Sequence, residues 1–390
     1  MNVYMDNAAT TPVSQLALSA MLPCFTQEYG NPSSIHSAGR QASILLQSAR
    51  DNIARLLGAQ PKEIYFTSGG TEADNWAISI AAEAGAKKGK KHIISSAIEH
   101  HAVLHALEKL KKQGFEITLL PVHSDGIVRP EELRSAIRED TALVTIMYAN
   151  NEIGTVQPIS ELSKICNEQS VLFHTDAVQA IGHIEIDIAA LGIDMLSLSA
   201  HKFHGPKGVG LLYCRSGIPI SPFIEGGAQE RGKRGGTENV PAIVGMAAAL
   251  KEAYNCMASD NEKISAMRDK LISALSTTKL SRLNGHAQNR LPGILNFCFE
   301  GIEGESLLLL LDRDGICASS GSACTSGSLD PSHVLLAIGL PHEIAHGSLR
   351  LSLSKYNTME EVEYLIEKLP PIIDRLRSMS PVWEQLEGSA

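Results

Sequence analysis

Along most of the chain, stretches in which hydrophobic residues recur every three or four positions alternate with short continuous runs of hydrophobic residues. From about residue 36 to residue 57, apolar residues return every three or four positions until Gly58, which predicts an amphipathic helix. Similar stretches alternate with short apolar runs, and this alternation is typical of βαβ units that form a mainly parallel sheet. The predicted strands are 64–66, 92–95, 117–120, 143–147, 171–174, 195–198 and 209–213, and the predicted helices between them are 72–84, 101–112, 130–137 and 159–168.

After Gly236 the pattern of apolar residues changes. A long region with helical spacing is followed by short apolar runs and a last helical stretch. A chain of 390 residues allows about two or three domains. We therefore expect an α/β protein with a large, doubly wound, mainly parallel sheet domain and a smaller α+β domain. In this region we predict helices at 238–257, 260–276 and 358–377 and strands at 294–297 and 349–352, with domain boundaries of 15–244 for the large domain and of 1–14 with 245–390 for the small domain.

The composition narrows the class of protein. The chain is 44% hydrophobic and 20% charged, which excludes disordered, collagen-like and fibrous proteins. Its 34 Lys and Arg against 43 Asp and Glu give a net charge of −9, which argues against a nucleic-acid partner because such partners require clustered basic residues. No apolar run approaches the roughly 20 residues of a membrane helix, and the first residues lack a signal-peptide pattern. We expect a cytoplasmic protein that does not contact the membrane.

Seven cysteines are spread along the chain without a CxxC pair or a tight Cys/His group. This odd number favours free thiols in a reducing compartment over disulfides or a zinc site. Free cysteines are usually buried, and Cys214 and Cys298, at the ends of apolar runs, fit that rule. Cys324 differs, because the stretch 319–328 around it consists of small polar residues and two glycines, which predicts an exposed loop.

Three motifs that follow predicted strands contain residues suited to catalysis or ligand binding. Lys202 lies just after the strand that ends near Leu198, Asp176 follows the strand 171–174, and Gly69-Gly70 separates a strand from a helix. Open α/β sheets build their sites at the carboxyl ends of strands, and a glycine-rich helix start favours phosphate. Each motif alone has a plainer explanation, as a surface lysine, a loop cap or a turn. Together they indicate a pyridoxal phosphate enzyme with a Schiff-base lysine, an acid for the pyridine nitrogen and a phosphate cradle.

These motifs, together with four further stretches, resemble the cysteine desulfurases of the nitrogen-fixation and iron–sulfur-cluster type. That family belongs to the class V aminotransferases, which have the fold type I architecture of pyridoxal phosphate enzymes. The four stretches are 4–11, 30–34, 150–154 and 234–239, and the resemblance covers essentially the whole chain. It implies a homodimer that converts L-cysteine to L-alanine, holds the sulfur as a cysteine persulfide, and passes it to an iron–sulfur scaffold protein or another acceptor.

The resemblance also implies a role for individual residues. Lys202 would bind the cofactor and move protons, His100 would stack on the ring and act as acid or base, and Cys324 would be the nucleophile. No resident metal site is expected, with Cys324 as a candidate transient ligand of a cluster. His101 is expected to be exposed. The expected cofactor-binding residues are Gly70, Thr71, His100, Asn151, Asp176, Gln179, Ser199, His201 and Lys202, with Thr237 contributed by the other subunit.

Substrate binding needs an anchor for a carboxylate. Arg350 matches the arginine that would hold it with two parallel hydrogen bonds, and Asn151 would assist. Ser354-Lys355 stands where the family usually has Gly-Arg, which puts the local geometry just past the anchor in doubt.

Two other functions stay open at the level of sequence. A selenocysteine lyase or an aminotransferase would use Lys202 and Asp176 without needing Cys324. A catalytically silent sulfur carrier or scaffold-binding protein would retain the fold without cofactor chemistry. The sequence also leaves the sulfur acceptor open among nitrogenase-type clusters, general cluster assembly and tRNA thiolation.

Overall fold

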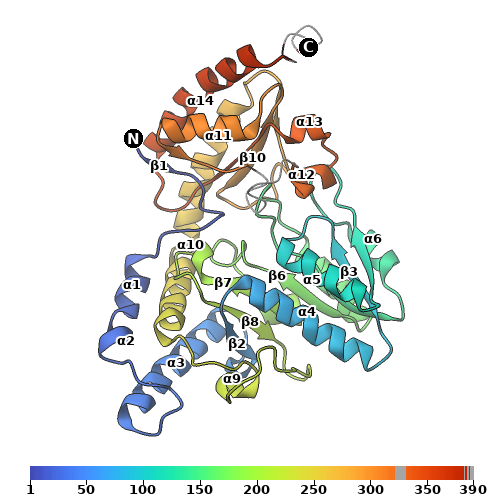
Figure 1. Cartoon of the computed structure of the whole chain (residues 1–390), viewed down its shortest axis with the longest axis vertical. Helices are drawn as coiled ribbons and strands as arrows, with labels where there is room; N and C mark the ends of the chain where they lie inside the picture. The colour runs from blue at the N-terminus through green and yellow to red at the C-terminus, as the bar shows by residue number, and fades with distance from the viewer. Residues whose placement is uncertain (321–330, 382, 384–385, 387–390) are drawn as a thin grey trace.

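The computed structural model describes residues 1–320, 331–381, 383 and 386, and its centre is a sheet of seven strands (Figure 1). Neighbouring strands are parallel from β4 through β3, β5 and β6 to β7. At the other edge β8 runs antiparallel to β7, and β2 runs antiparallel to β8. This confirms the predicted α/β fold with a mainly parallel sheet. The order across the sheet is β2 (Ile64–Thr67), β8 (Gly210–Cys214), β7 (Met195–Ser199), β6 (Leu172–Asp176), β5 (Thr141–Thr145), β3 (His92–Ser96) and β4 (Glu116–Leu120).

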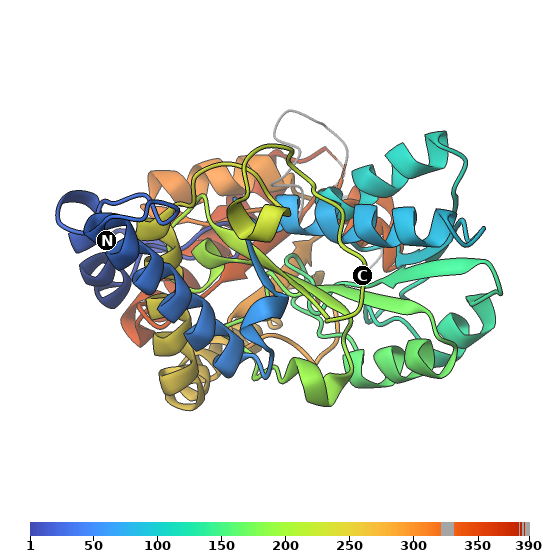
Figure 2. The same cartoon turned by 90° about the horizontal axis from the view of Figure 1, so that it is seen from below.

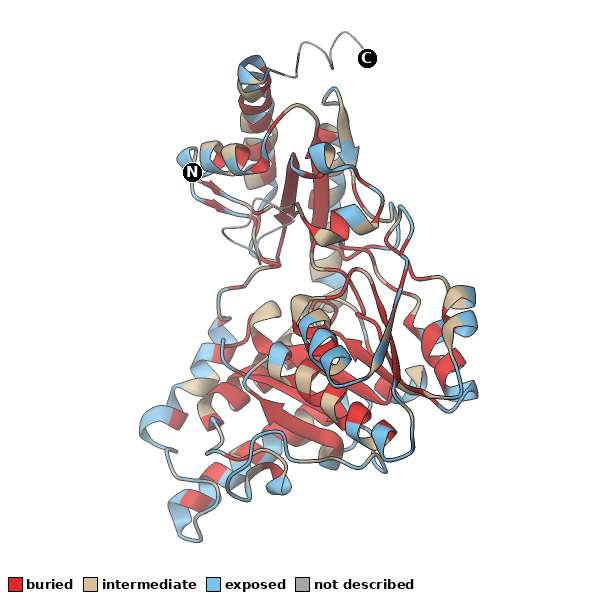
Figure 3. Ribbon diagram, turned by 45° about the vertical axis from the view of Figure 1, so that its right-hand side comes forward, coloured by how far each residue is buried: buried red, intermediate tan, exposed pale blue. Residues whose placement is uncertain are grey.

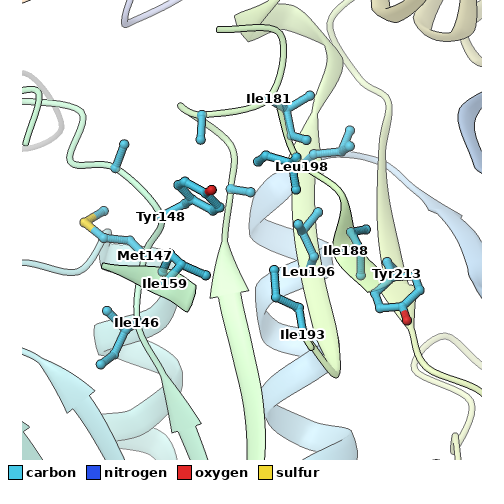
Figure 4. Close-up of a cluster of buried hydrophobic side chains, with 14 of the residues drawn as sticks. Ile146, Met147, Tyr148, Ile159, Ile181, Ile188, Ile193, Leu196, Leu198 and Tyr213 are labelled. Atoms are coloured by element: carbon cyan, nitrogen blue, oxygen red, sulfur yellow. The ribbon is translucent and has the colours of Figure 1, made fainter. Parts of the chain in front are cut away.

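Helices cover both faces of this sheet, as Figures 2 and 3 show. Alternate side chains of one strand enter different apolar layers: Leu143 packs in one, and Val144 packs in the other. Figure 4 shows part of the larger layer around Leu196 and Leu198 of β7. The first layer is closed by α4 (Gly70–Ala86) and α5 (His101–Lys112), and the second by α3 (Ser37–Leu56), α6 (Pro130–Ala136), α7 (Ile159–Glu168), α8 (Ile188–Leu191) and the first part of α10 (Val240–Leu275).

A second apolar core lies around a smaller sheet. In it, β10 (Ile294–Phe299) pairs antiparallel with both β12 (Ser348–Ser352) and β9 (Ser281–Leu283). Near the start of the chain β1 (Val3–Tyr4) pairs parallel with β11 (Ile316–Cys317). The remaining elements are α1 (Gln15–Met21), α2 (Pro23–Thr26), the short helices Pro61–Glu63 and Ala200–Lys202, α9 (Gln229–Gly232), α11 (Gly304–Arg313), α12 (His333–Ala337), α13 (His342–Ala345) and α14 (Met359–Met379).

One long helix replaces the two that the sequence predicted at 238–257 and 260–276. The 36 residues of α10 run without a break, because neither proline nor glycine interrupts the chain after Gly245. Its residues up to Leu250 pack in the core of the large sheet, and those from Ile264 onward pack in the core of the small sheet. The predicted boundary between 244 and 245 therefore falls inside a single helix, and the division into domains stays a prediction.

The described cysteines are all free thiols, and most are buried. Cys214 and Cys298 lie in the cores, as expected, and burial raises the pKa of Cys214 to about 12 and that of Cys298 to about 11. Such thiols are protonated and inert at neutral pH. Cys317 is exposed, and Cys324 lies outside the described residues. Among the helices of the described chain, none is long and apolar enough to cross a membrane.

Candidate active site

A cavity of about 300 Å³ lies beyond the carboxyl ends of strands β5, β6 and β7. This volume is at the lower end of small-molecule sites, which span roughly 300–1,000 Å³. Parallel strands place their carboxyl ends at one edge, so residues distant in sequence meet there. The cavity brings together the predicted residues Gly70, Thr71, His100, Asn151, Asp176, Gln179, Ser199, His201, Lys202 and Arg350.

Lys202 reaches the cavity from the short helix that follows β7. Its Nζ donates hydrogen bonds to the carbonyl oxygens of Ala8 and Ala9, at 2.6 and 2.9 Å. The side-chain amide of Gln179 donates to the carbonyl of Ala8 as well, at 3.0 Å. The N-terminal segment thus fixes the amine at the cavity wall, within reach of a bound ligand.

An acid pair lies at the bottom of the cavity. Asp176 ends β6, is buried, and accepts a hydrogen bond from the backbone N–H of Val178 at 2.9 Å. Burial raises the pKa of Asp176 to about 6, against the opposing charge of Lys202. Asp74 of α4 also lines the cavity, and burial and the charge of Asp176 raise its pKa well above its usual value. The sequence analysis missed Asp74.

Within the described residues, one oxygen of Asp74 is buried and unpaired. Its Oδ1 has no hydrogen-bond partner in the described part of the chain, and the nearest basic atom is Nε2 of His174 at 3.8 Å. Burial lowers the pKa of His174 to about 3, so that this imidazole is neutral. Two buried acids side by side favour a bound base that carries a proton, such as a pyridine nitrogen.

The start of α4 forms a cradle for an anion. Gly70 begins this 17-residue helix, and a Cβ there would lie 2.6 Å from Cγ2 of Val178, so the position excludes a side chain. The unpaired N–H groups at a helix start bind phosphate. Thr71, Ser199 and His201 line the same cavity, and a hydrogen bond of 3.1 Å joins Nδ1 of His201 to Oγ1 of Thr10.

His100 precedes α5 and caps its first turn. Its Nδ1 accepts a hydrogen bond from the backbone N–H of Ala102 at 3.1 Å. Burial, reinforced by the charge of Lys202, lowers the pKa of His100 to about 4, so the imidazole is neutral. His101, which we expected to be exposed, is partly buried, with its ring 4.9 Å from the ring of His333.

Arg350 enters the cavity from the middle of β12 and is almost fully buried. One terminal nitrogen, Nη1, donates to the carbonyl of Asn151 at 3.2 Å, and Nη2 donates to the carboxylate of Asp6 at 2.7 Å. The side chain of Asn151 lines the cavity beside it. A guanidinium at the cavity wall is suited to binding a carboxylate. The sequence analysis did not single out Asp6.

Comparison with known proteins shows to which family this chain belongs. The family described as aminotransferase class-V matches residues 3–365. The chain belongs to this family. It is 56% identical to the cysteine desulfurase IscS of Methanosarcina thermophila, over 97% of this chain and 94% of that protein, and 47% identical to the cysteine desulfurase NifS of Azotobacter vinelandii, over 98% and 95%.

Solved structures place this class V aminotransferase in the same group. A structure titled "NIFS-LIKE PROTEIN" superposes with a TM-score of 0.91 at 42% identity, over 96% of this chain and all of that chain. A second, titled "SspA in complex with cysteine", gives 0.82 at 37% identity, over 91% of this chain and all of that chain. The predicted resemblance to cysteine desulfurases and the fold type I architecture are confirmed.

Class V aminotransferases of the cysteine desulfurase group depend on pyridoxal phosphate, and the cavity fits this cofactor. The phosphate fits the cradle at Gly70, the ring nitrogen fits the buried acids Asp176 and Asp74, and the aldehyde carbon fits the amine of Lys202. Among the described residues, no group of three or more His, Cys, Asp or Glu side chains could hold a metal ion.

One predicted site residue of the described chain, Thr237, does not line this cavity. Thr237 lies exposed in a neighbouring pocket of about 230 Å³, beside Ser68 and Arg234. Its predicted contribution to another subunit stays a prediction, as does the role of Cys324, which lies outside the described residues.

Neither residue of the unusual Ser354-Lys355 pair lines the 300 Å³ cavity, but Ser354 lines a smaller pocket that shares Lys202 and Gln179 with it. The backbone N–H of Ser354 donates to the side chain of Asn357 at 2.8 Å, and Lys355 forms an ion pair with Glu252 of α10. This pair therefore ties the end of β12 to α10, while Arg350 keeps its place in the strand.

Proposed function

We propose that this class V aminotransferase is a homodimeric cysteine desulfurase that converts L-cysteine to L-alanine and holds the sulfur on Cys324 as a persulfide. The observation that carries this proposal is the meeting of the Lys202 amine, the buried Asp176 and the Arg350 guanidinium in one cavity. Pyridoxal phosphate supplies an electron sink when bound. Relatives at 47–56% identity named cysteine desulfurase support the same activity.

The residues of the cavity divide the work of this reaction. Arg350 binds the α-carboxylate of L-cysteine with two hydrogen bonds and so orients the bonds at its Cα. Lys202 moves the proton of Cα, and the neutral His100 accepts or returns a proton. The acid at Asp176 keeps the pyridine nitrogen protonated.

Sulfur leaves the substrate by attack of a protein thiolate. The sulfur of Cys324 forms a bond to the sulfur of L-cysteine, and the carbon–sulfur bond of the substrate breaks with its electron pair on carbon. Protons restore the methyl group of L-alanine, and the persulfide remains on Cys324. Because the transferred sulfur is held covalently, we propose that it then passes to an iron–sulfur scaffold protein or another acceptor in the cytoplasm.

The test of this activity is a mass balance on purified, cofactor-loaded enzyme. With L-cysteine and a thiol reductant, we expect L-alanine and sulfide in equal amounts. An aminotransferase would release a keto acid, and a selenocysteine lyase would leave L-cysteine unconsumed. A silent carrier would retain no coloured cofactor. Any of these three results would contradict the proposal.

A surface near the start of the chain supports the homodimer. Leu22 and Phe25 of the α1–α2 region are both more than half exposed, and Ile35 is 92% exposed. Clustered exposed apolar residues indicate a protein–protein surface. Because Thr237 is exposed outside its own cavity, a second subunit is where it would meet a cofactor phosphate.

The double variant Leu22→Asp/Phe25→Asp is expected to separate the subunits, because two charges would be buried in the interface. Sedimentation should then show the 41.9 kDa monomer, and the variant should lose cofactor more readily on dialysis because Thr237 no longer reaches the partner. Leu309→Asp on α11, at a leucine that is 67% exposed, is the matched control and should leave the dimer intact. A double variant that sediments like the unmodified protein would contradict this interface.

A further inference from the structure

An acid holds the guanidinium of Arg350 from outside the cavity. Nη2 of Arg350 donates to Oδ1 of Asp6 at 2.7 Å, yet Asp6 is absent from the residues that line the cavity. The Arg350 side chain is 3% exposed, against 21% for Asp6. Nε of Arg350 has no hydrogen-bond partner in the described part of the chain. The acid therefore contacts one side of the guanidinium, and a buried N–H remains unused on another.

The backbone around Asp6 is fixed to the strand that carries Arg350. The carbonyl of Met5 accepts from the backbone N–H of Ser352 at 2.7 Å, and the N–H of Asn7 donates to the carbonyl of Ser352 at 3.2 Å. Segment 5–8 thus lies along β12 with little freedom to move its carboxylate.

We infer that Asp6 is a positioning residue that sets the orientation in which Arg350 receives the α-carboxylate of the substrate; this rests on the proposed function of Arg350. A guanidinium has five N–H donors in a rigid planar fork. Asp6 and Asn151 occupy one donor on each terminal nitrogen, which prevents rotation of the fork. Nε and the hydrogens of the terminal nitrogens that Asp6 and Asn151 leave unused are the donors that remain for two carboxylate oxygens.

Asp6 also compensates the positive charge of the buried Arg350 guanidinium. A buried guanidinium without a partner is strongly unfavourable, and the free enzyme has no substrate to neutralise it. Asp6 provides that charge directly, through its 2.7 Å contact with Nη2. Because Asp6 lies outside the cavity, it neutralises Arg350 without occupying the place of the ligand.

The experiment compares cofactor-loaded Asp6→Ala, Asp6→Asn and unmodified enzyme, titrated with L-alanine or ethylamine and followed by visible absorption. Loss of a charge-assisted hydrogen bond should weaken L-alanine binding by about tenfold in Asp6→Ala, and ethylamine, which lacks a carboxylate, should bind as before. Asp6→Asn keeps an acceptor oxygen but loses the charge, so its binding of L-alanine should fall between that of Asp6→Ala and that of the unmodified enzyme. In turnover, KM for L-cysteine should rise with little change in kcat.

Tyr4→Phe is the matched control, because it removes a hydrogen bond of the same segment without touching Arg350. It should bind L-alanine like the unmodified enzyme. The inference is overturned if Asp6→Ala binds L-alanine as tightly or more tightly, if ethylamine weakens equally, or if Tyr4→Phe reproduces the loss.

Arg350→Ala separates this inference from the proposed function. If that variant still prefers L-alanine over ethylamine, the assignment of Arg350 fails, whatever Asp6 does. If Arg350→Ala loses the preference while Asp6→Ala keeps it, the proposed function stands and the inference about Asp6 fails. In the double variant Asp6→Ala/Arg350→Ala, no loss beyond that of Arg350→Ala is expected.

Discussion

Replacement of Lys202 by alanine is expected to abolish turnover of L-cysteine, with a loss of roughly 10⁴-fold or more, since it removes both the covalent attachment and the base. The amine is held at the cavity wall by the carbonyls of Ala8 and Ala9, and no other lysine in the described part of the chain lines that cavity. The visible absorption of the lysine-bound cofactor should be lost as well. Sulfide release and the absorption spectrum measure the two effects separately.

Lys207 offers a matched control five residues farther along the same loop. It is exposed and makes a long hydrogen bond, 3.4 Å, to the carbonyl of Thr11. Lys207→Ala should keep both the spectrum and the activity. If Lys202→Ala retained the visible band and turned over L-cysteine, another amine would have to carry the chemistry, and the assignment of Lys202 would fail.

Much of the cavity could be predicted because parallel strands determine which residues meet. Asp176 and Lys202 follow strands β6 and β7, which are neighbours in the sheet, and Asp176 pairs in register with Ser197. Once a doubly wound sheet is inferred from the alternating pattern, the carboxyl ends of its strands lie at one edge. Gly70 could be predicted as well, because a glycine between a strand and the start of a helix is a recognisable sequence pattern for a phosphate site.

Asp6 and Asp74 could not be predicted in this way. Asp6 meets Arg350 across 344 positions of sequence, through a bridge between the start of the chain and β12 that has no local pattern. Asp74 lies on α4 among apolar neighbours, where hydrophobic spacing predicts the buried face but not that one acid belongs to it. Both are buried or half-buried acids whose partners only the tertiary fold supplies.

The prediction of two helices in place of α10 failed for a related reason. Residues 251–263 are mostly polar, which indicates the end of a helix when each amphipathic stretch is judged alone. In the described part of the fold this stretch joins two apolar cores, and only Ala253 and Tyr254 at its start pack against the first of them. Good helix formers and the absence of proline keep it continuous.

Replacement of Cys324 by serine is expected to stop formation of L-alanine, with a loss of roughly 10³-fold or more, because a serine hydroxyl is a far weaker nucleophile than a thiolate at neutral pH. The cofactor-binding residues are untouched, so the visible spectrum and its change on addition of L-cysteine should persist. Alanine production and the mass of the alkylated persulfide measure the outcome. The expected pattern is therefore a bound substrate without sulfur transfer.

Cys317→Ser is the matched control for this variant. Cys317 is a free, exposed thiol of β11, only seven positions earlier in the chain. Its replacement should leave alanine production unchanged, whereas the buried Cys166, Cys214 and Cys298 have pKa values raised by burial and cannot substitute as nucleophiles. If Cys324→Ser kept normal turnover, the carbon–sulfur bond would break without the thiol of Cys324, and the persulfide on that residue would be ruled out.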